Sequence, residues 1–184
     1  MCKLSVCDLI SCYDLVSMTA DEPARAPHGA PAGKAEGTLR LDDQLCFALY
    51  AASRAVTQRY RPLLDEVGLT YPQYLVMLVL WEQGTTTVKG LGEALQLDYG
   101  TLSPLLKRLA AAGYVERRRR SDDERSVEIS LTDAGRKLKE RVGEIPQLVV
   151  DAYNLDASDF EALRAALREL AESVAASSGS SDAA

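Results

Sequence analysis

Among the residues able to carry chemistry, Cys46 has the most favourable position. The apolar spacing that begins at Leu41 predicts a long first helix that ends near Gly68, with Asp42 or Asp43 capping its start. Cys46 falls within about the first turn of that helix, where unpaired N–H groups and the helix dipole favour a thiolate. A thiolate attacks the O–O bond of a peroxide and becomes a sulfenic acid. The alternative is a buried, inert cysteine, the more common fate of a lone cytosolic cysteine.

Four tyrosines at helical spacing follow this cysteine: Tyr50, Tyr60, Tyr71 and Tyr74. A tyrosine hydroxyl can donate a hydrogen bond to a thiolate without bringing a competing charge. Tyrosines at such spacing are also typical of a core or an interface. From the residues alone, both roles stay open.

Other site chemistries are excluded by the composition. The single histidine, His28, lies in a stretch rich in Ala, Pro and Gly, which argues against a Ser–His–Asp triad or a multi-histidine metal site. The cysteines are Cys2, Cys7, Cys12 and Cys46, with no CxxC spacing and none later in the chain, so no disulfide framework can cross the core. We therefore expect no metal, no cofactor and a reducing, cytoplasmic location.

The charge distribution matters more than the net charge of −6. The chain has 184 residues, 47% hydrophobic and 26% charged, which suits one globular domain with tails. No apolar run is long enough to span a membrane, and no membrane partner is expected. Between Lys89 and Arg120, however, seven basic and three acidic residues give a local charge of +4. An acidic chain can bind DNA through such a local field.

The elements that must position these residues follow from periodicity and caps. We expect a flexible extension over residues 1–38, an ordered domain over 39–176 and a disordered tail over 177–184. Helical segments are predicted over residues 72–81, 88–95 and 98–112, from Thr132 through Ile145 with an interruption at Pro146, and after Asp156. Apolar–polar alternation predicts short strands over residues 114–117 and 126–131.

Helix, turn, helix and a basic two-strand hairpin form a winged helix-turn-helix, so the predicted fold is mostly α with a small β-hairpin wing. The second helix of such a pair enters the major groove. Its candidate DNA contacts, with those of the supporting helix and the wing, are Lys89, Tyr99, Thr101, Ser103, Lys107, Arg108, Arg118, Arg119, Arg120 and Arg125. Asp123 is expected to brace the wing by pairing with Arg125. The alternative is a merely solvated hairpin, with Thr101 and Ser103 as ordinary surface residues.

The segment from Asp123 to Thr132, DERSVEISLT, resembles the wing signature of MarR-type regulators. Over about residues 41–176 the chain is similar to the organic hydroperoxide resistance regulators (OhrR) of that family. The segments that carry this resemblance are DQLCFALY at 43–50, YRPLL at 60–64, LTYPQYL at 69–75 and LDYGTLSPLLKR at 97–108.

The resemblance implies a homodimeric, redox-sensing transcriptional repressor on a pseudo-palindromic double-stranded operator. It implies a DNA-binding part at about 70–131 and dimerisation helices at about 41–67 and 132–176. It makes Cys46 the sensor of organic hydroperoxide, with Tyr60 and Tyr71 of the partner subunit bonded to the thiolate. Because no cysteine follows position 46, the chain is similar to the one-cysteine type, which needs a small external thiol after oxidation.

Three alternatives remain open at this stage. Cys2, Cys7 or Cys12 on the extension could resolve the oxidised sulfur in place of an external thiol. The protein could be a MarR-type repressor that responds to a small aromatic ligand, with Cys46 inert. It could also be a thiol peroxidase, although we expect no enzyme, because its basic residues are concentrated on a wing.

Overall fold

The structure, a computed structural model, describes residues 39–119 and 126–179. The chain divides into two compact units after Asp43. Of the first unit the structure describes residues 39–43, in which Leu41–Asp43 form a short 3-10 helix, η1. The elements below belong to the second unit, Gln44–Ala184.

Helix α2, Leu45–Asp65, carries the candidate sensor cysteine near its start. Its N-cap is Gln44, whose side chain makes no capping hydrogen bond. The expectation that Asp42 or Asp43 caps this helix is therefore wrong, because both residues are taken up in η1. The expected turn at its far end is confirmed, since Gly68 has a φ of +70°, a conformation that favours glycine.

Helix α3, Tyr71–Gln83, forms the centre of the core. A capping box starts it, in which the Thr70 amide donates to the Gln73 side-chain oxygen at 2.8 Å. Its buried residues cover more than one face: Gln73, Tyr74, Val76, Met77, Val79 and Leu80. The helix packs against α2 on one side and against the DNA-binding helices on the other.

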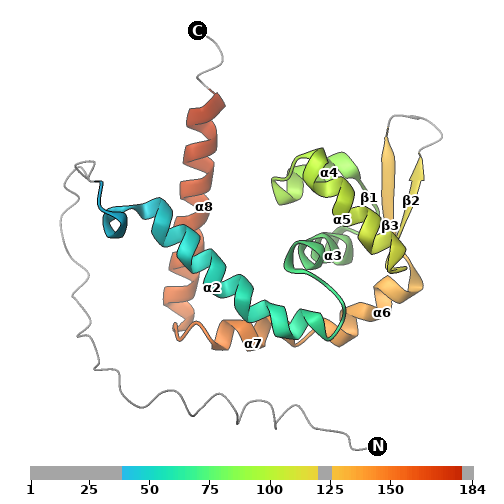
Figure 1. Cartoon of the computed structure of the whole chain (residues 1–184), viewed down its shortest axis with the longest axis horizontal. Helices are drawn as coiled ribbons and strands as arrows, with labels where there is room; N and C mark the ends of the chain where they lie inside the picture. The colour runs from blue at the N-terminus through green and yellow to red at the C-terminus, as the bar shows by residue number, and fades with distance from the viewer. Residues whose placement is uncertain (1–38, 120–125, 180–184) are drawn as a thin grey trace, which may run out of the picture. The chain divides into compact units, whose positions relative to one another are not determined.

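The helix-turn-helix and the wing follow as the sequence predicts (Figure 1). Its helices are α4, Val88–Leu95, and α5, Tyr99–Ala111; its strands are β2, Val115–Arg119, and β3, Val127–Leu131. A third strand, β1, Thr86–Thr87, makes the sheet antiparallel in the order β1-β3-β2. The sequence analysis missed β1, because two residues are too few to show alternation.

The C-terminal segment forms three helices: α6, Asp133–Val142, α7, Ile145–Asp151, and α8, Ala157–Gly179. The break between α6 and α7 falls at positions 143–144, ahead of the expected Pro146, because proline suits the first turn of the new helix. Helix α8 runs three residues into the stretch expected as a tail, and residues 180–184 lie outside the described part.

Helix α8 is exposed along its length within one chain. Through residue 177, only Phe160 and Leu170 are half-buried, and the apolar Leu163, Leu167 and Val174 are about half-exposed. Figure 1 shows it away from the group formed by α3, α4, α5 and the sheet. No helix among the described residues is long and apolar enough to cross a membrane.

Gly135 should be intolerant of a side chain. A Cβ there would overlap the Tyr114 carbonyl oxygen, and the Gly135 carbonyl accepts a hydrogen bond from Trp81 Nε1 at 2.9 Å. We expect Gly135→Ala to lower the free energy of unfolding by about 1–3 kcal/mol, measured in urea. Gly143→Ala is the control: its nearest neighbour would be 3.5 Å away, so its stability should match or exceed wild type. Equal stability of the two variants would contradict this packing.

Candidate functional site

The start of α5 is held by Asp98, its N-cap residue. Its carboxylate accepts hydrogen bonds from the Thr101 amide at 2.9 Å and the Thr101 hydroxyl at 2.8 Å. These bonds hold the pKa of Asp98 below its ordinary value. The expected cap is confirmed. The Thr101 hydroxyl proton is already used by Asp98, so Thr101 can offer DNA only its oxygen as an acceptor.

The remaining α5 candidates divide by exposure. Tyr99, Lys107 and Arg108 are exposed, and Ser103 is half-buried. The opposite face is buried, through Leu102, Leu105, Leu106 and Leu109. The helix therefore keeps one polar face for a ligand while the other face holds it on the core.

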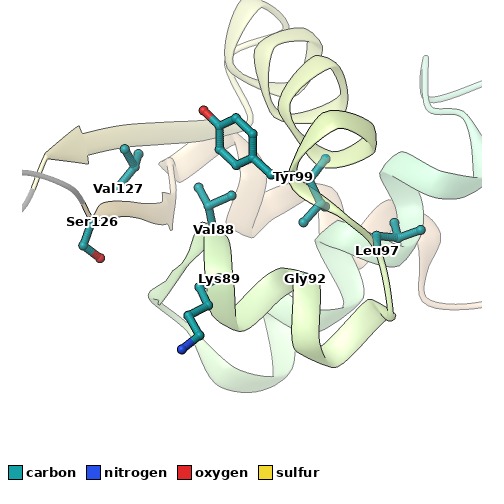
Figure 2. Close-up of a pocket in the computed structure, with 8 residues that line it drawn as sticks. Val88, Lys89, Gly92, Leu97, Tyr99, Ser126 and Val127 are labelled. Atoms are coloured by element: carbon teal, nitrogen blue, oxygen red, sulfur yellow. The ribbon is translucent and has the colours of Figure 1, made fainter. Parts of the chain in front are cut away.

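A crevice of about 550 Å³ lies between α4, the start of α5 and the wing (Figure 2). Its floor is largely apolar and its rim polar; the lining residues are Val88, Lys89, Gly92, Leu97, Tyr99, Leu102, Ser126 and Val127. Figure 2 shows the Tyr99 ring above Val88, with Ser126 and Val127 to one side. Two predicted DNA contacts, Lys89 and Tyr99, thus meet at one surface feature. Lys89 pairs with Glu93 at 3.8 Å, and both side chains are exposed, so this pair is weak.

The wing arginines separate onto two faces of β2. Arg117 is paired in register with the buried Ile129, and Arg119 with Val127, which lines the crevice. Directly paired residues share a face, so Arg117 and Arg119 lie on the crevice side of the sheet. Arg118 lies on the other face, where its guanidinium pairs with Glu116 at 3.1 Å.

Arg117 is a residue that the sequence analysis did not single out. It is half-buried, and its Nε has no hydrogen-bond partner within the described chain. Strand alternation counted from Val115 would have placed it inward. The other wing candidates, Arg120, Asp123 and Arg125, lie outside the described residues.

Cys46 is the second residue of α2, as expected, and its side chain is exposed. A buried, inert cysteine is therefore wrong for the single chain. The apolar residues Leu45 and Tyr50 nearby are also more than half exposed.

Tyr60 and Tyr71 meet near the other end of α2. Their ring centroids are 4.9 Å apart, and Tyr74 extends the group at 5.8 Å from Tyr60. Burial is the main cause that raises the pKa of all three phenols, and the neighbouring phenols add to it. The group therefore remains neutral and keeps its hydroxyl protons for donation.

The cysteine and the tyrosines of one chain cannot touch. Fourteen residues of continuous helix separate Cys46 from Tyr60, which is about 21 Å at the helical rise. A hydrogen bond requires about 3 Å. Any bond between this thiolate and these hydroxyls must join two chains.

Tyr153 also belongs to this group and was missed. It lies directly after α7, packs against the core and is hydrogen-bonded to Tyr60. Tyr153 shows no periodic relation to the α2 tyrosines, so only the packing of α7 on α2 reveals it.

The fold and these surfaces define a winged helix-turn-helix DNA-binding protein. The family profile described as transcriptional regulator SarA/Rot matches residues 58–142. The chain is 48% identical over 136 residues to the organic hydroperoxide resistance transcriptional regulator of Bacillus subtilis, covering 74% of this chain and 92% of that protein. It is 38% identical over 123 residues to the regulator SarZ of Staphylococcus epidermidis, covering 67% and 83%.

Among solved structures, reduced AbfR bound to DNA is similar with a TM-score of 0.65 and 36% identity, over 74% of this chain and 93% of that one. AbfR, from Staphylococcus epidermidis, has also been solved overoxidised on DNA and in a disulfide form. The chain belongs to the MarR family of winged-helix transcriptional regulators, within the group that contains the organic hydroperoxide resistance regulators. Its relatives are regulators and not enzymes.

The tyrosine group should make the fold sensitive to alkali. Tyrosine has an ordinary pKa of 10.0, and the folded chain raises the pKa of Tyr60, Tyr71 and Tyr74. Above pH 10 the folded state binds more protons than the unfolded state, so stability is full below that pH and falls as pH rises. Urea unfolding at pH 8 and pH 11 should show a smaller loss for Tyr60→Phe than for wild type. Tyr50→Phe, outside the group, should follow wild type; identical losses in all three proteins would refute the assignment.

Proposed function

We propose that this protein is a redox-sensing transcriptional repressor that binds operator DNA when Cys46 is reduced and is released when organic hydroperoxide oxidises Cys46. The observation that carries the proposal is the exposed Cys46 at the start of α2, combined with neutral tyrosine donors that only a second chain can bring to it. The Bacillus subtilis relative, named for organic hydroperoxide resistance, supports the choice of oxidant.

The chemical step is a two-electron oxidation of sulfur. The Cys46 thiolate attacks the terminal oxygen of ROOH, the S–O bond forms and the O–O bond breaks. The leaving alkoxide takes up a proton and departs as the alcohol ROH, while Cys46 becomes a sulfenic acid. A small external thiol then condenses with the sulfenic acid, releasing water and leaving a mixed disulfide.

The active form is a homodimer. Helix α8 and the first half of α2 expose apolar side chains that one chain leaves uncovered, among them Leu45, Leu163 and Leu167. A second copy that covers them also brings the tyrosines of one subunit to the Cys46 of the other. Two-fold symmetry then places two wings on a pseudo-palindromic operator with half-sites about one helical turn apart.

DNA contacts follow the crevice between α5 and the wing. Tyr99, Lys107 and Arg108 on the exposed face of α5, with Ser103, reach the major groove, while Lys89 and Arg119 border the crevice and contact phosphates. Arg120 and Arg125 extend the wing toward the minor groove, with Asp123 as its brace.

Core packing links the sensor to this surface. Tyr71 is the first residue of α3, and α3 packs against both α4 and α5. Oxidation removes the negative charge that holds the Tyr60 and Tyr71 hydroxyls. A change of position at Tyr71 then tilts α3 and the helices on it, so the two recognition helices no longer match the two grooves.

Cys46→Ser should separate sensing from DNA binding. Serine is smaller by little and the site is exposed, so stability and DNA affinity should stay within roughly 0.5 kcal/mol of wild type. In a DNA-shift assay, cumene hydroperoxide should release wild type and leave the variant bound. Release of the variant would place the switch elsewhere, whereas no release of wild type would favour a repressor controlled by a small ligand.

Mixed dimers test the exchange between subunits. One chain carries Cys46→Ser and both tyrosines; the other carries Cys46 with Tyr60→Phe and Tyr71→Phe. Oxidation at Cys46, followed by mass spectrometry, should be as fast as in wild type, because that cysteine meets the intact partner tyrosines. The homodimer of the second chain should be slow. If the mixed dimer is equally slow, the tyrosines do not act across the interface.

The two faces of β2 predict unequal roles for neighbouring arginines. Arg119→Ala should weaken operator binding and reduce the slope of log K against log salt by about 1, because one phosphate contact is lost. Arg118→Ala is the matched control and should keep the slope of wild type, since Arg118 pairs with Glu116 on the opposite face. The reverse ranking would show that the other face of the wing meets DNA.

A further inference from the structure

The ring of Tyr153 is held between two helices. Its amide donates to the Val150 carbonyl at 3.0 Å in the last turn of α7, and the next residue, Asn154, has a φ of +51°. The ring stacks on Phe160 of α8, with centroids 6.1 Å apart and planes 14° apart. Backbone and stacking together fix where its hydroxyl lies.

That hydroxyl meets the sensor tyrosines. Helix α7 packs against α2, and Tyr153 is hydrogen-bonded to Tyr60. After burial, the nearness of Tyr153 is the next cause that raises the pKa of both Tyr60 and Tyr71. Because the hydrogen bond itself raises the pKa of Tyr60, Tyr60 is the donor and Tyr153 the acceptor.

We propose that Tyr153 is a positioning residue of the sensor, which holds the Tyr60 hydroxyl in place for the partner's thiolate and connects it to the turn between α7 and α8. The inference rests on the proposed function, since it assigns a further residue to the same site. The juxtaposition of Tyr60, Tyr71 and Tyr153 in one half-buried group carries it.

Hydrogen-bond counting defines what Tyr153 does. A phenol has one proton to donate and can also accept. Without a thiolate, Tyr60 donates to Tyr153. With a thiolate present, Tyr60 donates to the sulfur, and Tyr153 turns its own proton toward the Tyr60 oxygen. That second bond polarises the first and strengthens it.

The bond between Tyr60 and Tyr153 therefore reverses direction with the charge on sulfur. When oxidation removes that charge, the Tyr60 proton returns to Tyr153. The hydroxyl of Tyr153 thereby supplies an acceptor in the oxidised state and a supporting donor in the reduced state. Its ring rests on α8, the helix whose apolar residues need a second copy.

Tyr153→Phe tests the proposal, because it removes the hydroxyl and keeps the ring that stacks on Phe160. In the full-length dimer, oxidation of Cys46 by cumene hydroperoxide should slow roughly three- to tenfold, the range expected for one hydrogen bond. The same substitution in a Tyr60→Phe background should change the rate less than about twofold, because Tyr153 acts through Tyr60. Tyr114→Phe removes a half-buried hydroxyl outside the group and should react at the wild-type rate.

Two results would overturn the proposal: a wild-type rate for Tyr153→Phe, or equal slowing with and without the Tyr60 hydroxyl. A second measurement is independent of peroxide chemistry. In protein labelled with tyrosine carrying ¹³C at Cζ, the Tyr60 resonance should move in Tyr153→Phe and stay in place in Tyr114→Phe. If wild-type Cys46 fails to react with hydroperoxide, the proposed function fails, while this resonance still decides whether Tyr153 holds Tyr60; an unmoved resonance refutes that contact.

Discussion

The rigidity of α2 is the constraint on which the rest depends. One continuous helix holds the cysteine near its first residue and Tyr60 two-thirds of the way along. A helix of this length does not fold back, so its two chemical groups cannot meet within one chain. A sensor built from them needs two chains, and two chains related by a two-fold axis present two wings to DNA. Sensing and DNA recognition therefore depend on the same dimer.

Helix α3 is suited to carry a change between them because it has no freedom to move alone. Residues such as Val76, Met77 and Leu80 have no exposed surface, and Tyr74 is nearly as buried. Close-packed interiors transmit displacements and do not absorb them. A shift at Tyr71, where α3 begins, must be shared with α4 and α5, which rest on it.

Much of this fold could be predicted from the sequence, because local signals agree with the final structure. Asp98 and Thr132 cap the helices that follow them, and the alternation around Ile129 marks a strand. The two-residue β1 and the group around Tyr153 could not be predicted, because both depend on contacts between distant segments. Equivalence of Arg118 and Arg119 was also suggested by composition, and strand register separates them.

Neutral donors give this site a large contrast between its two states. A hydrogen bond to a charged group contributes about 1.5–3 kcal/mol and one between neutral groups about 0.5–1.5 kcal/mol, so each hydroxyl loses roughly 1 kcal/mol when sulfur loses its charge. Two hydroxyls at each of two sites give roughly 4 kcal/mol, a factor of about 10³ in the balance between two conformations. A lysine in their place would keep its own charge after oxidation and leave a buried, unpaired cation. Burial, which raises the pKa of Tyr60 and Tyr71, therefore keeps the donors neutral in both states and lets the charge on sulfur alone set the conformation.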